Sequence, residues 1–384
     1  MISDILIRRI LNSNGGFAYE AEIQLDNKYN GIGAAPSAIM IGRREKKITS
    51  KIFPQELVYQ LIGCDVDQES LDSYLDNNIQ SLGSDITLAI SMAFARAMSN
   101  CKDISLVDYL KNICPNKQND RQIAPIIPIF SGGIHDPELG GSMQQIMLKI
   151  ENMDFQNSVE VICLIYNQVE NILTKKGMKK GIAASSGFLV HGMSIEEEFE
   201  FINDLITNSP WEKNLSIAVD VAAEHLRTQD GYMFYNKMYQ PDEFESLLLA
   251  YIDKYRITYL EDPFDCNDIS NWKSLHEKIN TKTEIIADDY SATQLCYLEK
   301  NIADGFIIKM KQVGTVIETL KMVSQVKKLG LKTCVSHRSS ETEDTFICDL
   351  AIAIDSDYMK IGAPRRGDRV EKYNRLIRLY NINL

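Results

Sequence analysis

The sequence predicts an α/β protein whose larger part is a closed β/α barrel, preceded by a smaller α+β domain. Three observations support this: short apolar runs recur along the chain, helix-like segments separate them, and ionisable residues follow most runs. Continuous apolar strands that alternate with helices form parallel sheets buried on both faces. About seven or eight such units favour a closed barrel over an open sheet. The runs are Ile126–Phe130, Leu215–Val219, Ile257–Leu260, Glu284–Ala287, Gly305–Ile308, Lys332–Val335 and Met359–Ile361.

Length and composition limit the class of protein. The chain has 384 residues, of which 45% are hydrophobic and 24% charged, a balance that can bury a full-sized core and argues against disorder. The formal net charge of −12 disfavours nucleic-acid binding, which needs a basic surface. No stretch approaches the roughly 20 apolar residues of a membrane span. Met1–Asn12 lacks the cleavage site of a signal peptide, and eight scattered cysteines without a CxxC spacing resemble reduced thiols. We therefore expect a cytoplasmic protein without a structural zinc site.

The first part of the chain has its own pattern. Alternating apolar and polar residues over residues 19–25 predict a half-buried strand, and the Gly/Ala/Pro/Ser run Gly31–Ser37 predicts a loop. Two helices are expected at Gln55–Ile62 and Ile86–Met98, the second with small residues that permit close packing.

The polar segment Cys114–Arg121 is the expected domain boundary. The sequence thus predicts an N-terminal α+β capping domain over residues 1–120 and a C-terminal β/α-barrel catalytic domain over residues 121–384.

Ionisable residues gather at the predicted strand ends. In a β/α barrel the carboxyl ends of the strands meet at one mouth, where active sites lie. Any one of these residues could simply cap a strand, but six strand ends together indicate a shared pocket. Several carboxylates around one point repel each other unless a cation lies between them, and oxygen ligands favour Mg²⁺ or Mn²⁺. The residues are Asp220, Glu261, Asp262, Asp288, Asp289, Lys309, His337, Arg338 and Lys360.

Several motifs in the same order resemble those of enolase. They are Tyr-Leu-Glu-Asp-Pro-Phe at 259–264, Ile-Ala-Asp-Asp at 286–289, Lys-Met-Lys-Gln-Val-Gly at 309–314, Val-Ser-His-Arg-Ser-Ser-Glu-Thr-Glu-Asp-Thr-Phe at 335–346, and Lys-Ile-Gly-Ala-Pro-Arg at 360–365. Weaker similarity covers almost the whole chain. The resemblance implies the enolase-type barrel with its capping domain, a homodimer, and the glycolytic conversion of 2-phosphoglycerate to phosphoenolpyruvate.

By this resemblance, Asp220, Glu261 and Asp288 would hold Mg²⁺ beside the substrate carboxylate. Lys309 would be the general base that removes the α-proton. Lys360 would neutralise the developing enediolate. Metal charge would stabilise this intermediate.

The resemblance also assigns residues to the rest of the substrate. Arg338 and Ser339 match positions that bind the phosphate, and Arg geometry suits that task. His337 is assigned to the catalytic residues, and His135 to substrate binding in the same pocket. The other histidines are interpreted as surface, packing or loop residues; they are His191, His225 and His276.

The chain departs from the family on the side that expels water. Two family glutamates that protonate the departing hydroxyl are replaced by Gln145 and, within one residue, Ser186. Gln145 is assigned to substrate binding at this position. Asp136 or Glu138 would have to supply the proton if the protein is a true enolase. The loop that carries a metal-binding serine in the family reads Ser-Ala-Ile-Met-Ile-Gly over residues 37–42, which puts a second metal in doubt.

Three functions stay open at this point. The first is a Mg²⁺-dependent lyase that forms an enediolate from a phosphorylated carboxylic acid. The second is a paralogue acting on a phosphonate or a phosphoenolpyruvate-like compound, similar to carboxyphosphonoenolpyruvate synthase. Lys311, where the family usually has asparagine, would favour a more anionic substrate. The third is a non-catalytic enolase-like binding protein.

Overall fold

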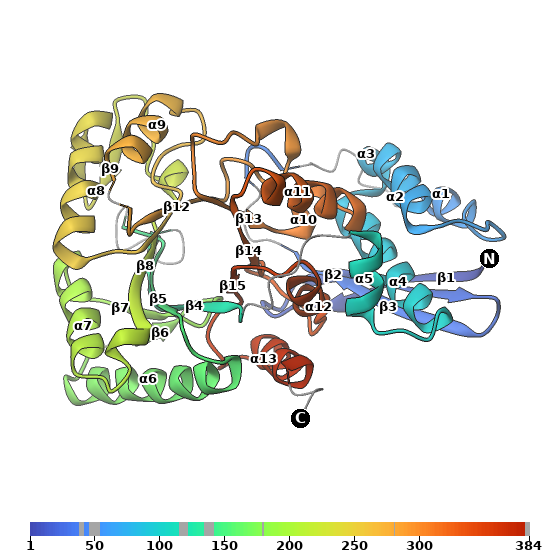
Figure 1. Ribbon diagram of the computed structural model, residues 1–384, viewed down its shortest axis with the longest axis horizontal. Coiled ribbons are helices and arrows are strands. Elements are labelled where there is room, and N and C mark those ends of the chain that lie inside the picture. Colours follow the sequence, from blue (N-terminus) through green and yellow to red (C-terminus); the bar gives the residue numbers. More distant parts are fainter. Residues whose placement is uncertain are drawn as a thin grey trace.

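The computed structural model describes residues 1–37, 42–45, 54–114, 122–133, 142–178, 180–279 and 281–380. Figure 1 shows the N-terminal elements at one end and the barrel at the other. The N-terminal part is an antiparallel sheet of three strands followed by helices. These elements are β1 (Ile2–Leu11), β2 (Phe17–Leu25), β3 (Tyr29–Ala35), α1 (Gln55–Tyr59), α2 (Gln68–Asn77), α3 (Ile79–Leu82), α4 (Ser84–Cys101) and α5 (Leu106–Ile113).

The predicted loop at Gly31–Ser37 is wrong, because most of it is strand β3. Its glycines serve a close approach rather than a turn. A Cβ on Gly31 would lie 2.1 Å from the carbonyl oxygen of Ala93, and one on Gly33 would lie 2.6 Å from that of Ala89. Strand β3 therefore lies directly on the small-residue face of α4, as the alanines of that helix predicted.

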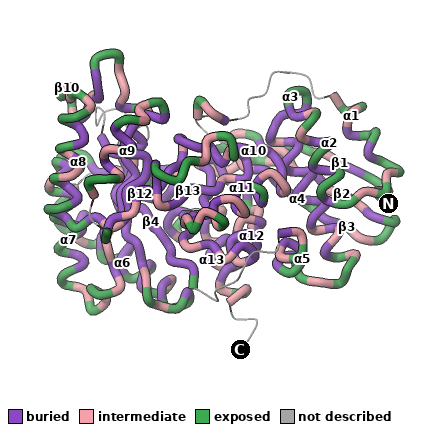
Figure 2. Tube along the Cα trace, turned by 45° about the horizontal axis from the view of Figure 1, so that its top comes forward, coloured by how far each residue is buried: buried purple, intermediate pink, exposed green. Residues whose placement is uncertain are grey.

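Eight strands close into a barrel, since β15 pairs with β4. Figure 2 shows these strands as buried and the outer helices as exposed on their outer sides. The barrel strands are β4 (Ala124–Ser131), β5 (Gln145–Ile150), β8 (Leu215–Asp220), β11 (Tyr259–Glu261), β12 (Glu284–Ala287), β13 (Gly305–Ile308), β14 (Lys332–Ser336) and β15 (Tyr358–Lys360). The seven predicted runs all overlap these strands.

The prediction of an all-parallel barrel is wrong for β5. This strand, which the apolar pattern did not reveal because Lys149 interrupts it, runs antiparallel to both β4 and β8. Its first residue therefore lies where its neighbours end: Gln145 pairs with Asp220 of β8 and with Ser131 of β4. Antiparallel pairing thus brings Gln145 to the mouth of the barrel.

Helices and short strands surround the barrel. They are α6 (Phe155–Lys175), β6 (Lys180–Ile182), β7 (Phe188–Val190), α7 (Ile195–Thr207), β9 (Tyr232–Phe234), β10 (Lys237–Tyr239), α8 (Pro241–Tyr255), α9 (Ile269–Lys278), α10 (Met310–Val313), α11 (Val316–Lys328), α12 (Phe346–Ala353) and α13 (Gly367–Tyr380). Short 3₁₀ turns lie at Glu212–Asn214, Ala223–His225 and Leu295–Tyr297. None of the described helices is long and apolar enough to cross a membrane.

Side chains of the described residues fill the interior of the barrel, which is a packed core rather than a channel. Every barrel strand contributes to this buried cluster. Its members are Ala124, Ile126, Met147, Ala218, Tyr259, Ile286, Ile307, Cys334 and Tyr358.

The N-terminal part packs on the barrel through buried polar contacts. The Ser91 hydroxyl of α4 accepts a hydrogen bond from the backbone N–H of Val316 at 2.9 Å. Arg96 pairs with Asp344 beyond β14, at 2.7 Å. The segment 115–121, most of the predicted boundary, lies outside the described residues.

Candidate active site

A cavity of about 340 Å³ opens at the barrel mouth. It lies where the ionisable residues were expected to gather, and eight of the predicted site residues line it. Glu261 lies beside it and bonds to Lys360, while His135 lies outside the described residues, as do Asp136 and Glu138. The eight lining residues are Gln145, Asp220, Asp288, Lys309, His337, Arg338, Ser339 and Lys360.

Two lysines are paired with the three predicted metal ligands. The ammonium group of Lys360 donates to Asp220 at 2.8 Å and to both oxygens of Glu261 at 2.9 and 3.0 Å. The ammonium group of Lys309 contacts the Asp288 carboxylate. All five side chains are largely withdrawn from water, and only Lys309, 15% exposed, is not fully buried.

These contacts set the charges of the groups. Burial opposes charge on Lys309 and Asp288, but their attraction outweighs it, so the pKa of Lys309 is raised and that of Asp288 is lowered. Burial, together with the charge of Asp220, raises the pKa of Glu261 to about 8. Lys309 is therefore held protonated by the charge of Asp288, and a protonated lysine cannot accept a proton.

The donor set fits a hard divalent cation such as Mg²⁺. Asp220, Glu261 and Asp288 supply only carboxylate oxygens, and Oδ1 of Asp288 is buried without a hydrogen-bond partner among the described residues. The ammonium groups of Lys309 and Lys360 supply the positive charge beside these carboxylates.

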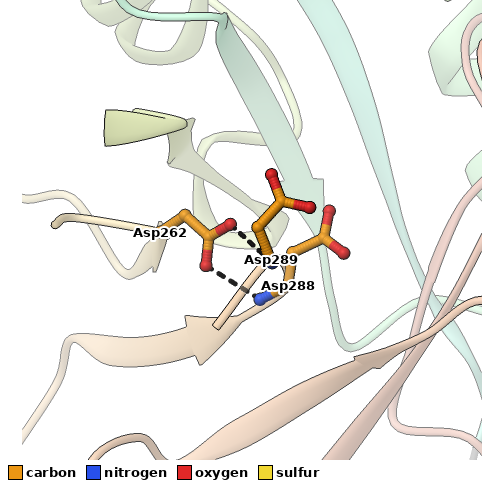
Figure 3. A group of neighbouring side chains, drawn as sticks. All are labelled: Asp262, Asp288 and Asp289. Carbon is orange, nitrogen blue, oxygen red and sulfur yellow. Dashed lines mark hydrogen bonds between the residues drawn. The ribbon is translucent and has the colours of Figure 1, made fainter. Parts of the chain in front are cut away.

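A second group of carboxylates lies beside this set. Among the described residues, it is the group in which one carboxylate oxygen from each member lies within 4.8 Å of the others, and its members are Asp262, Asp288 and Asp289. Figure 3 shows that the two oxygens of Asp262 point at the backbone N–H groups of Asp288 and Asp289, at 2.9 and 2.8 Å. Because both oxygens are already used, Asp262 holds the turn after β12 and orients Asp288 rather than acting as a ligand.

The side of the cavity where the family acids would lie is neutral. Nε2 of Gln145 donates to the Ser185 hydroxyl at 2.9 Å, and both side chains are buried. Ser185, rather than the predicted Ser186, lines the cavity; Ser186 is buried outside it with a φ of 70°. The neighbouring Gln144 donates to Asp220 at 3.2 Å. An amide and a hydroxyl can orient a substrate, but neither can deliver a proton at neutral pH.

Arg338 and His337 follow strand β14. Nη2 of Arg338 donates to both oxygens of Glu45 at 2.8 and 3.0 Å, and both side chains are buried. Burial and the positive charges of Arg369 and Lys360 hold the pKa of His337 well below its usual value. His337 is therefore neutral, and its Nδ1 has no hydrogen-bond partner among the described residues.

Sequence reasoning gave no role in the pocket to several residues that line it, among them Arg43, Glu45, Glu224 and His225, whereas Asp289 was expected there and does line it. His225 is exposed as expected but belongs to the 3₁₀ turn after β8, which brings it to the cavity. Glu224 and His225 follow Asp220 by four and five positions, so they belong to the loop at the same mouth, and this closeness in sequence is the signal that could have found them.

The role expected for Lys311 is wrong. Its ammonium group turns away from the cavity to the N-terminal helix α4, where it donates to the Ser84 hydroxyl at 2.8 Å and pairs with Asp85. The charge of Lys311 is thus balanced by Asp85 and gives no support to a more anionic substrate.

Comparison with known families matches the barrel part of the chain. A family described as Enolase, C-terminal TIM barrel domain, matches residues 122–382, which span every barrel strand and the lining residues that these strands carry.

Proposed function

The chain belongs to the enolase family, and from this premise we propose that it is a Mg²⁺-dependent lyase-type enzyme that forms an enediolate from a small phosphorylated or phosphonylated carboxylic acid. The observation that carries the proposal is the cluster of Asp220, Glu261 and Asp288 with Lys309 and Lys360 at one barrel mouth. Removing a proton next to a carboxylate requires a base and nearby positive charge, and this cluster offers both.

The residues divide the task as follows. Lys309 takes the α-proton once Asp288 no longer holds its amine in the protonated form. Lys360, buried beneath the carboxylates, remains a cation that favours the doubly charged enediolate. Arg338 and Ser339 bind the phosphate or phosphonate group. A bound Mg²⁺ would supply positive charge next to the substrate carboxylate.

The fate of the enediolate distinguishes two candidate reactions. In the nominal reaction, 2-phosphoglycerate loses hydroxide and becomes phosphoenolpyruvate. The neutral pair of Gln145 and Ser185 favours the second candidate, a paralogue whose phosphonate or phosphoenolpyruvate-like substrate needs no proton for a departing hydroxide. Loss of a positioned acid costs about 10²–10⁴ in rate, so dehydration should be slow.

NMR of the protein with 2-phosphoglycerate and Mg²⁺ in D₂O tests both points, because it follows deuterium exchange at the α-carbon and phosphoenolpyruvate formation together. We expect exchange without matching product. Lys309→Met should reduce exchange by at least about 10²-fold, whereas Lys321→Met, at an exposed lysine on α11, should not.

The other outcomes are equally decisive. Product formed as fast as exchange would show that another group supplies the proton and that the neutral pair was misread. If Mg²⁺ binds but neither 2-phosphoglycerate nor a phosphonate analogue exchanges, the catalytic proposal fails and a binding function replaces it.

A further inference from the structure

Each described cation that lines the cavity faces a carboxylate. Such pairing in a substrate pocket means that an incoming anion must compete for every positive charge it uses. The pairs are Lys309 with Asp288, Lys360 with Asp220 and Glu261, Arg338 with Glu45, and Arg43 with Glu224 and Asp265.

These pairs differ in what can release them. The partners of Lys309 and Lys360 are the proposed metal ligands, so a bound metal would compete for these carboxylates and release both ammonium groups from their ion pairs. Glu45 belongs to no such group. Arg338 therefore stays neutralised by Glu45 after the metal site is filled, although it is the residue expected to bind the substrate's phosphate.

The position of Glu45 is fixed by its neighbours. Its Oε1 also accepts the backbone N–H of Gly42 at 3.1 Å. The adjacent Arg44 donates to the backbone carbonyl of Cys266 at 2.7 Å, and its guanidinium lies 4.1 Å from the ring centre of Tyr297. Since Arg44 anchors this short segment to the barrel loops, the Glu45 carboxylate stays close to Arg338 and acts as a built-in competitor.

We propose that Glu45 is a specificity-determining residue, whose carboxylate occupies the Arg338 guanidinium and must be displaced by the substrate's anionic group. This inference rests on the proposed function, in which Arg338 binds that group. A singly charged carboxylate gains little by replacing another carboxylate. A doubly charged phosphate or phosphonate gains more, because its second charge and third oxygen strengthen its contacts with the guanidinium. Glu45 thus selects dianionic phosphoryl or phosphonyl substrates over singly charged ones.

Isothermal titration calorimetry with inorganic phosphate and with acetate, both in the presence of Mg²⁺, tests this. Glu45→Gln should bind phosphate at least about tenfold more tightly than the unmodified protein, since close charge pairs commonly couple by more than 1.4 kcal/mol. The affinity of Glu45→Gln for acetate should increase more than its affinity for phosphate. The ratio of the two affinities, which measures the preference for the dianion, should therefore fall. Glu343→Gln, the same charge change at an exposed position of the loop after β14, should leave both affinities unchanged.

Two further measurements keep the result interpretable. The double variant Glu45→Gln with Arg338→Gln should lose the gain in phosphate affinity. That loss would show that the gain depends on the pairing of Glu45 with Arg338. Thermal unfolding should show that Glu45→Gln melts at a lower temperature and is stabilised by phosphate more than the unmodified protein, because an unpaired buried cation regains a partner.

Unchanged or weaker phosphate binding by folded Glu45→Gln would overturn the inference and make Glu45 a residue that merely positions Arg338. The α-proton exchange assay decides the proposed function separately. Exchange without tighter binding would reject only the competition by Glu45, and tighter binding without exchange would reject only the catalytic proposal.

Discussion

Replacing Gln145 with glutamate is expected to supply the proton donor that dehydration lacks. The site tolerates the change, because Gln145 and glutamate have nearly the same shape and the Ser185 hydroxyl, 2.9 Å away, can donate to a carboxylate as readily as it now accepts from the amide. The neighbouring β8 strand places Asp220 directly opposite in the pairing register.

These surroundings also set the size of the effect. Position 145 is 3% exposed, and both burial and the facing charge of Asp220 disfavour ionisation of the introduced carboxyl. It should therefore stay protonated near neutral pH, as a general acid must. A positioned acid contributes about 10²–10⁴ in rate, so Gln145→Glu should raise phosphoenolpyruvate formation from 2-phosphoglycerate by about 10²-fold when Ser185 is left unchanged.

Phosphorus NMR measures phosphoenolpyruvate formation, and proton NMR in D₂O measures exchange in the same sample. The matched control is Gln144→Glu. Gln144 donates directly to Asp220, so a carboxylate there would repel a proposed metal ligand, weaken Mg²⁺ binding and give no gain. If Gln145→Glu exchanges the α-proton normally and still makes no more product, Gln145 does not lie where the departing hydroxide would need a proton.

Three other outcomes are expected. Mg²⁺ at a hundredfold excess over its Kd should stabilise the protein by about 2.7 kcal/mol, and Asp288→Asn should abolish most of the resulting rise in Tm; an equal rise in the variant would place the metal elsewhere. Burial raises the pKa of Glu198 from 4.5 to about 8, so the folded state holds a proton that the unfolded state releases, and stability falls as pH rises between these values. Glu198→Gln should therefore be about as stable as the unmodified protein near pH 4.5 and more stable by up to about 5 kcal/mol above pH 8; urea denaturation that finds the same difference at both pH values would refute the cause. Gly31→Ala should lower the free energy of unfolding by about 3 kcal/mol, because its Cβ would meet the Ala93 carbonyl, whereas Gly367→Ala, with open space around it, should change little in the same denaturation experiment.

The sequence by itself determined the barrel and the identity of most of its mouth. Parallel strands buried on both faces leave continuous apolar runs, and the residues at the carboxyl end of each run must lie at the mouth. Asp220, Asp288 and Lys309, which follow their runs, and Lys360, which lies within the last run, could therefore be placed from the sequence. The motifs that resemble enolase pointed to the same residues, and the family match covers them.

The local pattern failed where a residue's role depends on a distant partner. Gly31 begins a segment whose composition is typical of a loop. Its close contact with Ala93 of α4 explains why a glycine lies in the strand there. Lys311 follows the predicted base by two positions, yet α4 draws it away from the cavity to Asp85.

Only the tertiary structure decided which neighbours meet at the site. The reversed direction of β5 brings Gln145 opposite Asp220, and the packing of the N-terminal part brings Glu45 to Arg338 across 293 positions of sequence. Periodicity reports which face of an element is buried, but it carries no information about strand direction or about the partner that a buried charge finds. Those choices follow from the closure of the barrel and the cost of leaving a buried charge unpaired.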